Sequence, residues 1–512
     1  MTDKLLAQQV DVGSPVPYVD DSWIQRLWDW ADQAQIQDLH WVKHKDHPKG
    51  GWWKGLPRDR HTLLTLQKLN LNSSNLVALP AEIGNLSQLQ TLYLSKNSLR
   101  ALPAQIGQLS QLRELDVSCN YQLSDLPAEI GQLSQLEVLH LDCTALSVLP
   151  KAIFQLSQLQ RLHLSSIKFS VLPAEIGQLS QLQMINLRGN KLTALPAEIG
   201  QLNQLQKLYL GGNELSILPD EIAQLSQLQV LELKGNRFTD LPAELISRLG
   251  QLRELDLSSN RMSTLPAEIG CLGQLHELKL GYNCLSELPA ELGQLVQLRT
   301  LTLGGNRLNA LPLELGQLSQ LQVLDLNSNK LTFFPTVLSQ ISQLQTLILT
   351  DNQLSALPQE IGQFSQLQWL SLGHNQLAAL PVELFQLSQL QQLWLGRNHL
   401  SILPAEIGRL NQLQKLSVTS NKLNALPPEI GQLSQLQELY LSSNKLDQLP
   451  AEIGQLRQLR KLVIEGNPLV DLPVEMSQLK QLREMGISKG HFNREQKAHI
   501  KSLLPKCKLT YP

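Results

Sequence analysis

The sequence predicts an α/β solenoid, in which about nineteen short parallel strands form one continuous sheet. The first observation is a proline that recurs eighteen times between Pro80 and Pro473, with fifteen intervals of 23 residues and two of 24. The second is the LxLxxN segment of each repeat, where apolar and polar residues alternate as they do in a strand. A fixed period of this length predicts units that each pack only on their two neighbours.

Several columns of the repeat have structural roles. An inward Asn ends most strands, and its amide can pair the backbone groups that a turn leaves buried. Glu occupies the second position after the proline in fifteen of the eighteen units, where the exposed N–H groups of a first helical turn favour a carboxylate. These glutamates therefore belong to the scaffold and are not candidate catalytic acids. The IGQLSQLQ arm turns its leucines inward and its glutamines and serines toward water, so this convex side suits solvation.

Some repeats depart from the pattern. The inward Asn is replaced at Ser74, Thr144, Ile167 and Gly490, and we expect a locally irregular ladder at the consecutive Thr144 and Ile167. One extra residue near Tyr121 falls in the turn after a strand, and a second one, between Glu244 and Leu252, lengthens a convex arm. We expect each extra residue to form a small bulge and not a domain boundary.

The ends of the chain differ in composition from the array. Residues 1–22 are polar and predict a mobile tail. Residues 23–62 hold six of the eight tryptophans, with an amphipathic helix predicted over WIQRLWDWADQ, a short helix or strand over 36–42, and a chain break at HKDHPKGG. This segment is interpreted as a cap on the first repeat, or as an independent ligand module. The repeats span 63–490, and 491–512 predicts a C-terminal cap, with a helix from an Asn493 N-cap to Leu504 and a strand over 508–511.

Composition excludes some classes of protein. Lys+Arg 43 against Asp+Glu 45 leaves a net charge of −2, which argues against a nucleic-acid partner. Five scattered cysteines indicate reduced thiols in a cytosol-like compartment. The N-terminus has no signal-peptide pattern, and no window has enough uninterrupted apolar residues for a membrane span.

The unit LPxEIGxLxxLxxLxLxxNxL resembles the leucine-rich repeat family, in the 23-residue version found in cytoplasmic bacterial proteins, Ras-binding scaffolds and plant resistance proteins. The resemblance covers about residues 63–504. It implies a horseshoe with the parallel sheet on its concave face, 3₁₀ or helical arms outside, and protein binding through the concave face. The closing LLPKCKLTY looks like the end cap of bacterial members, and the tryptophan segment looks like a bacterial N-terminal cap. A C-terminal ubiquitin-ligase domain, present in some secreted members, is not expected in the forty or so residues after Pro473.

Candidate binding residues lie between the inward leucines, because alternate strand residues face out. This outward column varies along the chain while the scaffold columns do not, which favours the concave face as the binding surface. The first predicted partner-binding patch has exposed aromatic and basic residues, which dominate binding hot spots. It consists of Ile348, Trp369, His374, Trp394, Arg397 and Tyr440. The second is acidic and aromatic and suits a basic partner. It consists of Tyr93, Glu114, Asp116, His140, Asp142, His163 and Tyr209.

Two smaller groups have chemical alternatives. His40, His44 and His47 have a spacing that could hold a metal ion, although a solvated cap segment is the favoured interpretation. Cys119 and Cys143 occupy equivalent positions on adjacent strands, so a disulfide or thiol metal site competes with two free thiols. No phosphate loop, nucleophile elbow or zinc motif occurs, and nothing closes over the concave column to exclude water. We therefore assign no catalytic residue, cofactor or metal, and predict that the protein is not an enzyme.

The first functional hypothesis is a cytoplasmic, bacterial-type scaffold that binds one or more proteins on its concave face, without nucleic-acid or membrane partners and as a monomer. The second is a secreted effector, without a classical signal peptide, that uses the same face on a host protein. The third, from another class, is recognition of a glycan or small ligand by the Trp369/Trp394 cluster.

Overall fold

The computed structural model describes residues 21–44, 47–488 and 492–510. The chain divides into two compact units, residues 1–167 and 168–512, and each is described by itself. In the described residues, every parallel strand pair joins strands that follow one another in sequence, in a register that places each inward leucine beside the next.

One repeat shows how the local sequence forms the unit. The strand β9 (Lys207–Tyr209) follows the 3₁₀ turn η6 (Ala197–Gln201). Pro196 has φ −70° and ψ 149°, so its ring fits the extended residue that precedes the turn, and its carbonyl accepts a bond from Ile199 N at 3.1 Å. Ile199 and Leu208 are fully buried. The core of each repeat is therefore a column of aliphatic side chains between the strand and the convex arm.

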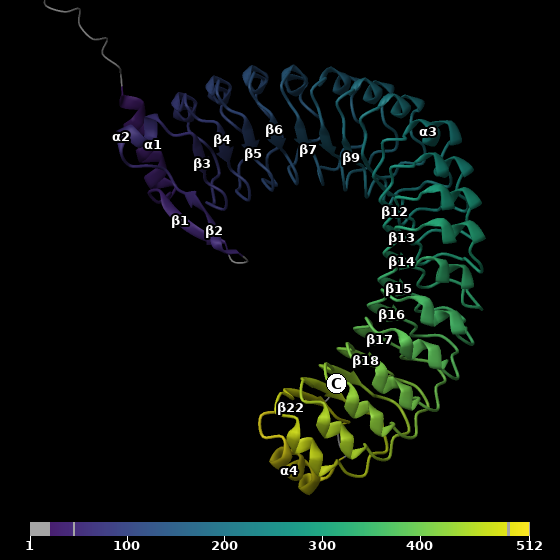
Figure 1. Cartoon of the computed structure of the whole chain (residues 1–512). Helices are drawn as coiled ribbons and strands as arrows, with labels where there is room; N and C mark the ends of the chain where they lie inside the picture. The colour runs from purple at the N-terminus through teal and green to yellow at the C-terminus, as the bar shows by residue number, and fades with distance from the viewer. Residues whose placement is uncertain (1–20, 45–46, 489–491, 511–512) are drawn as a thin grey trace, which may run out of the picture. The chain divides into compact units, whose positions relative to one another are not determined.

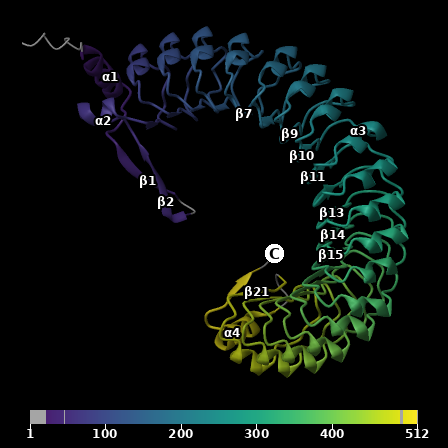
Figure 2. The ribbon, with the colours of Figure 1, turned by 45° about the horizontal axis from the view of Figure 1, so that its top comes forward.

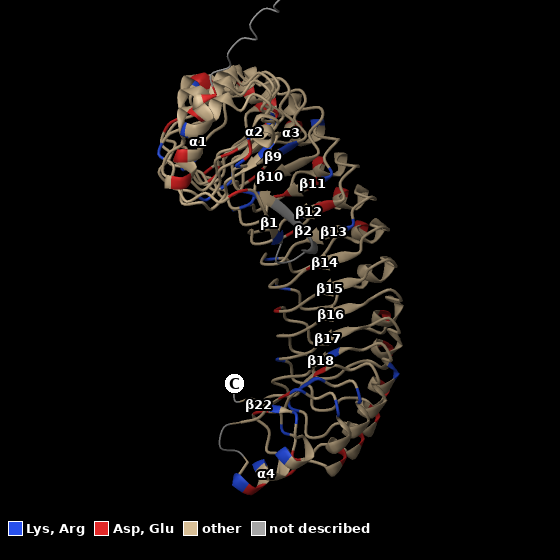
Figure 3. Ribbon diagram, turned by 90° about the vertical axis from the view of Figure 1, so that its left-hand side faces the viewer, with Lys and Arg blue, Asp and Glu red and all other residues tan. Residues whose placement is uncertain are grey.

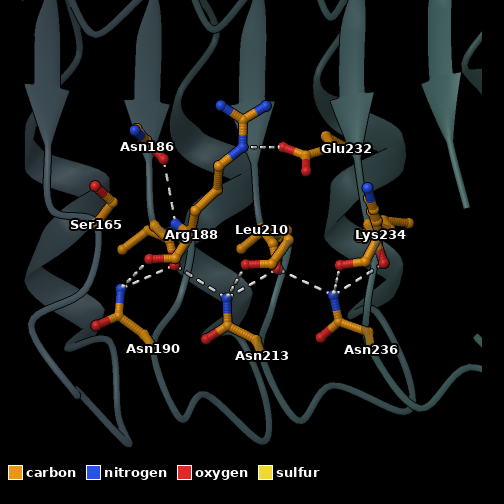
Figure 4. A network of polar contacts seen from close by, with 12 residues as sticks. Ser165, Asn186, Arg188, Asn190, Leu210, Asn213, Glu232, Lys234 and Asn236 are labelled. Atoms are coloured by element: carbon orange, nitrogen blue, oxygen red, sulfur yellow. Dashed lines mark hydrogen bonds and ion pairs between the residues drawn. The ribbon is translucent and has the colours of Figure 1, made fainter. Parts of the chain in front are cut away.

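The inward Asn pairs buried backbone groups, as predicted (Figure 4). Asn213 Nδ2 donates to Leu187 O at 3.0 Å and to Leu210 O at 2.8 Å. Its Oδ1 accepts from Leu192 N at 3.1 Å. The same three contacts recur at Asn236 and in most later repeats, so the amides form a ladder that joins each turn to the preceding repeat.

The ladder is irregular at the predicted place. Thr144 Oγ1 donates to Leu141 O at 2.8 Å, and a hydroxyl lacks the second N–H of an amide. Leu123 N donates to the backbone carbonyl of Asn120 at 3.0 Å instead of to a side-chain amide. The next replacement, Ile167, is the last residue of the first unit. The fourth replacement, Gly490, lies outside the described residues.

The two extra residues lie where the sequence placed them, in a turn after a strand and in a convex arm. Tyr121 lies in the turn that follows β5 (Glu114–Asp116), and its side chain is exposed. The second extra residue converts a five-residue 3₁₀ turn into the α-helix α3 (Ala243–Arg248).

Among the described residues, the first element of the first unit is the predicted helix α1 (Ser22–Gln33), with Ile24, Leu27 and Ala31 buried. The predicted break at HKDHPKGG is wrong, because β1 (His40–His44) and β2 (His47–Lys54) form an antiparallel hairpin through this stretch. Trp28 Nε1 donates to Pro57 O at 2.9 Å and thereby anchors the helix. A short helix, α2 (Arg60–Leu64), leads into the array.

The N-terminal elements contact the first repeat. Arg26 Nε of α1 lies 2.6 Å from Glu82 Oε1 at the first 3₁₀ turn, and Gly55 N after β2 donates to Asn70 O of the first parallel strand at 3.1 Å. A cap needs such contacts, because the first strand otherwise has an unpaired edge. The unit contains β3 (Lys68–Asn70), β4 (Thr91–Tyr93), β5, β6 (Val138–His140), β7 (Arg161–His163), η1 (Ala81–Asn85), η2 (Ala104–Gln108), η3 (Ala128–Gln132) and η4 (Lys151–Gln155).

The second unit is a curved array whose strands line the inner side and whose short turns form the outer side (Figures 1 and 2). Its strands are β8 (Met184–Asn186), β9, β10 (Val230–Glu232), β11 (Glu254–Asp256), β12 (Glu277–Lys279), β13 (Thr300–Thr302), β14 (Val323–Asp325), β15 (Thr346–Ile348), β16 (Trp369–Ser371), β17 (Gln392–Trp394), β18 (Lys415–Ser417), β19 (Glu438–Tyr440), β20 (Lys461–Val463), β21 (Glu484–Gly486) and β22 (Lys508–Thr510). Besides η6 and α3, its convex arms are η5 (Ala174–Gln178), η7 (Asp220–Gln224), η8 (Ala267–Cys271), η9 (Ala290–Gln294), η10 (Leu313–Gln317), η11 (Thr336–Gln340), η12 (Gln359–Gln363), η13 (Val382–Gln386), η14 (Ala405–Arg409), η15 (Pro428–Gln432), η16 (Ala451–Gln455) and η17 (Val474–Gln478).

The nineteen predicted array strands correspond to β3 through β21, and each contains its predicted inward residue. The C-terminal elements are also confirmed. The helix α4 (Arg494–Leu503) begins at the Asn493 N-cap, with a capping box to Gln496, and β22 pairs with β21 in parallel. None of the described helices is long and apolar enough to cross a bilayer.

Candidate functional site

The outward side chains of each three-residue strand lie in two rows that run across the sheet. We call the residue before the inward leucine the first row and the residue after it the second row. A third row, the turn row, is the residue immediately before the ladder Asn. Parallel pairing places row members of adjacent strands side by side, so the rows decide which candidate residues meet.

The first patch uses all three rows of the second unit. Its second-row members are Ile348, Trp394 and Tyr440, which alternate with Ser371 and Ser417. The small serines leave room above the sheet, and the rings of Trp394 and Tyr440 stack across Ser417 at 5.9 Å between centroids, with 28° between their planes. The structure therefore brings Trp394 and Tyr440 together although they belong to strands that are not neighbours.

Trp369 lies in the first row, next to Gln392. Its side chain is exposed, and 39% of its surface reaches solvent. Gln392 Oε1 accepts a bond from Trp394 Nε1 at 3.4 Å, so Gln392 stands between the two tryptophans. The two indoles border one surface from different rows.

Charged residues continue the first row beyond the tryptophans. Lys415 Nζ lies 3.0 Å from Glu438 Oε1, and the Tyr440 hydroxyl donates to Glu438 Oε2 at 2.7 Å. Burial opposes ionisation of Glu438, but the bonds from Tyr440 and Lys415 outweigh it and lower the pKa of this carboxyl. Burial and the Glu438 carboxylate raise the pKa of the Tyr440 hydroxyl, which therefore stays protonated. These contacts hold the Tyr440 ring in place against Trp394.

His374 and Arg397 occupy the turn row at equivalent positions, with φ of 55° and 57°. This left-handed conformation is unusual for residues with a Cβ, and both side chains point away from the core and are exposed. His374 Nδ1 lies 2.8 Å from Asp351 Oδ1 of the preceding turn. These two residues therefore form a polar border and do not contact the aromatic rings in any described interaction.

The second patch is a connected network in the first unit. The Tyr93 hydroxyl donates to Glu114 Oε2 at 3.0 Å, and Glu114 Oε1 lies 3.7 Å from His140 Nε2. The His140 and His163 rings stack with centroids 4.1 Å apart, and His163 Nδ1 lies 4.0 Å from Asp142 Oδ2. Asp116 pairs in register with His140 on β6. Strand register thus assembles six of the seven predicted residues.

Burial changes the proton affinities in this network. Burial and the Glu114 and Asp116 carboxylates raise the pKa of Tyr93 to about 12. Burial and the neighbouring His140 lower the pKa of His163 to about 4, although Asp142 opposes the change. His163 is therefore neutral at neutral pH.

Tyr209, the seventh residue, belongs to the second unit. The Arg188 guanidinium lies over its ring, 4.3 Å from the centroid, and Arg188 Nε donates to Glu232 (Figure 4). Gly211 provides the space for this carboxylate, because a Cβ there would approach Glu232 Oε1 to 2.3 Å. The Tyr209 ring is therefore covered on one face by a neighbouring repeat.

A shallow depression beside Tyr209 was not predicted from the sequence. Its lining combines Arg188 and Lys279 with the carboxylates of Glu232, Glu254, Asp256 and Glu277. Charged residues of both signs lie along these strands in Figure 3. The sequence contains these charged residues, but their grouping becomes apparent only when the first-row residues are considered together with the second-row residues.

The smaller candidate groups have different outcomes. His40 Nδ1 lies 2.9 Å from Asp38 O, whereas the structure describes only the backbone of His44 and His47. Cys119 and Cys143 both lie in left-handed turns of adjacent repeats, with φ of 56°. Burial and the neighbouring Cys143 thiol raise the pKa of Cys119, so the two sulfurs are near one another as thiols.

Comparisons with known proteins agree with this geometry. A family model described as leucine-rich repeat region matches residues 58–124, 111–184, 162–243 and 337–422. A second, described as leucine rich repeat, matches residues 226–285, 296–354 and 411–469. A search of curated proteins found no match.

Solved structures show the same fold. A leucine-rich repeat protein of Leptospira interrogans is 38% identical, with a TM-score of 0.65, and the match covers 90% of this chain and 100% of that one. A TDR receptor is 28% identical, with a TM-score of 0.60 and coverage of 83% and 84%. The plant peptide hormone receptor RGFR1, solved in complex with RGF2, is 27% identical, with a TM-score of 0.56 and coverage of 85% and 84%. The repeat sequence, the parallel strands and these matches lead to one conclusion: the chain belongs to the leucine-rich repeat family.

Proposed function

We propose that this protein is a non-enzymatic binding module that recognises a partner protein through the inner sheet face of its second unit. Solenoids of this kind are typical protein-interaction domains, because their curvature offers an extended binding surface. The first patch, Ile348, Trp369, His374, Trp394, Arg397 and Tyr440, is the proposed contact area.

One observation carries this proposal. The second row alternates large and small residues, which stacks Trp394 on Tyr440, and Trp369 of the first row is exposed next to the strand of Trp394. A large, pre-ordered aromatic surface contributes to binding with little further loss of side-chain entropy. The exposed Arg397 and His374 on the turn row give this surface a polar border, as interfaces have.

The second patch, in the first unit, is proposed as a contact for a basic partner surface. Its support is the cluster of Glu114, Asp116 and Asp142 around two histidines, which favours positive charge. Tyr209 is a separate contact in the second unit.

We also propose a reducing, cytoplasmic setting for this module, because neighbouring free thiols such as Cys119 and Cys143 persist in such compartments. Secretion of the chain with and without residues 1–22 tests the alternative of a secreted effector.

The binding experiment uses affinity capture from a lysate, followed by a titration of the recovered partner. We expect Trp394→Ala to weaken binding by about 2 kcal/mol, roughly thirtyfold in Kd, because Trp is a typical hot-spot residue. The Trp369/Trp394 double variant should lose capture altogether, while the melting temperature changes little.

A matched control is Phe333→Ala, which removes an aromatic side chain that is 79% exposed outside the three rows. It should leave the affinity unchanged. Equal affinity of the double variant and the parent would disprove the proposed surface. Capture that survives protease treatment of the ligand pool would replace the partner protein with a glycan or small ligand.

A further inference from the structure

Two histidines and an aspartate converge on the sheet face of the first unit. His140 on β6 and His163 on β7 are directly opposite in the parallel register, and Asp142 follows His140 by two residues on the same outward side. One ligand atom from each of the three residues lies within 4.8 Å of the other two. All three side chains are partly buried, so neither ring swings freely in solvent.

We propose that His140, Asp142 and His163 form a binding site for a divalent transition-metal ion of the zinc and cobalt class. Two imidazole nitrogens and one carboxylate oxygen are a common donor set for such ions, whereas calcium and magnesium prefer sites made of oxygen ligands. This inference does not depend on the proposed partner-binding function.

The geometry needs only a small side-chain adjustment. A tetrahedral ion with ligand distances of about 2.0–2.1 Å holds its donor atoms roughly 3.4 Å apart. The present separation of His163 Nδ1 and Asp142 Oδ2 is 4.0 Å, and the two stacked rings are 4.1 Å apart at their centroids. Binding of one ion requires the donor atoms, now within 4.8 Å of one another, to close to this spacing, and the two stacked rings to tilt apart so that their lone pairs converge.

Neighbouring groups already orient the Asp142 carboxylate and place a second carboxylate near His140. Asp142 Oδ1 accepts bonds from Ser165 N at 2.7 Å and Ser165 Oγ at 2.5 Å, which leaves Oδ2 on the side of His163. Glu114 Oε1 lies 3.7 Å from His140 Nε2, and Tyr93 holds the other oxygen of Glu114. Metal-binding histidines commonly have such a carboxylate as an outer partner.

The charge balance also favours a cation. Three carboxylates, those of Glu114, Asp116 and Asp142, lie around the histidines. The positive charge that acts on His163 from its own strand is that of Arg161. Three protein ligands leave a fourth position open toward the sheet face for water or for a donor of another molecule. The His374–Asp351 pair in the second unit, with one exposed imidazole, provides an internal comparison that lacks the second histidine.

The experiment titrates metal-free protein with Co²⁺ and follows the visible d–d absorption, with Zn²⁺ competition to obtain the affinity for zinc. The parent carries His40→Asn, His44→Asn and His47→Asn, so that the histidines of the N-terminal hairpin do not contribute. We expect one tightly bound Co²⁺ per chain. His163→Asn and His140→Asn should each abolish this phase, and Glu114→Gln should weaken it about tenfold, as loss of an outer-shell partner does.

Asp351→Asn, which changes the single-histidine pair, should leave the metal affinity unchanged. Circular dichroism of each variant confirms that the repeat structure is retained, and the conservative Glu114→Gln keeps the test valid if a histidine variant misfolds. The proposal is overturned by the absence of one-to-one binding, or by equal affinity in His163→Asn and the parent. Sulfur-to-cobalt charge transfer would also overturn it, because that signal assigns the ion to Cys119 and Cys143.

Discussion

The repeats around Asn213 and those around Thr144 and Ile167 share nearly the same leucines but differ in their inward polar residue. In the second unit, Asn213 satisfies two carbonyls and one N–H of the buried turn. In the first unit, Thr144 makes one of these contacts, and Ile167 has no side-chain hydrogen-bonding group. Strands β6 and β7 keep the parallel register although Thr144 and Ile167 replace the amides, so a complete amide ladder is not required for strand pairing.

The irregular repeats are also the ones with unusual outward chemistry. His140 and His163 precede Thr144 and Ile167 in the same two repeats, and Cys143 immediately precedes Thr144. The regular repeats carry the stacked Trp394 and Tyr440 instead. Two kinds of candidate site are therefore built on the same scaffold, one where the ladder is complete and one where it is interrupted.

The largest expected effect comes from removal of a ladder amide. Asn213→Ala leaves Leu192 N without its partner and removes one of the two amide bonds to each of Leu187 O and Leu210 O. We expect it to cost on the order of 3 kcal/mol of unfolding free energy. Urea unfolding followed by circular dichroism measures the loss, and hydrogen exchange of Leu192 N reports the local opening. Asn213→Thr should fall between the parent and the alanine variant. A cost below about 1 kcal/mol would show that packing, not the amide, stabilises the turn.

Acidification should weaken the irregular region through His163. Burial, His140 and Arg161 favour the neutral form of His163, and this effect outweighs the opposing effect of the Asp142 and Asp116 carboxylates. The pKa of His163 therefore falls to about 4 in the folded chain. An unfolded histidine titrates near 6.5. The stability that neutral His163 contributes is therefore complete above about pH 6.5, and it is lost as the pH falls toward 4. In metal-free protein we expect a loss on the order of 2 kcal/mol between these limits.

Urea unfolding at a series of pH values tests this prediction. His163→Asn should flatten the profile between pH 4 and 6.5 relative to the parent. An unchanged profile would assign the acid sensitivity to other groups.

The smallest expected effect is a gain from restoring the ladder. Thr144→Asn replaces one O–H with the two N–H groups of an amide, so one N–H is available for Val117 O. This carbonyl already accepts from Asn120 Nδ2 at 2.8 Å. In the regular repeats the equivalent carbonyl, Leu187 O, accepts from both Asn190 and Asn213. We expect a stabilisation of about 1 kcal/mol, measured by urea unfolding. Destabilisation by this substitution would mean that the extra residue near Tyr121 has altered the turn too far for an amide to fit.

The sequence by itself determined the repeating unit. The period of 23 residues, the inward leucines, the ladder Asn, the proline before each 3₁₀ turn and the Asn493 N-cap all depend on residues close together in the chain. Such local signals repeat in every unit, so each repeat supports the assignment of the others. The predicted interruption at Thr144 and Ile167 followed from the same logic.

Only the tertiary structure decided which outward side chains meet. The stack of Trp394 on Tyr440 depends on a small Ser417 between them, and the contact of His140 with His163 depends on two strands that pair in exact register. The N-terminal hairpin escaped prediction because Pro48, Gly50 and Gly51, which usually interrupt a strand, lie within β2, where pairing with β1 holds the chain extended. Contacts of this kind arise from the register between segments that are distant in sequence, and they cannot be predicted from the composition of either segment.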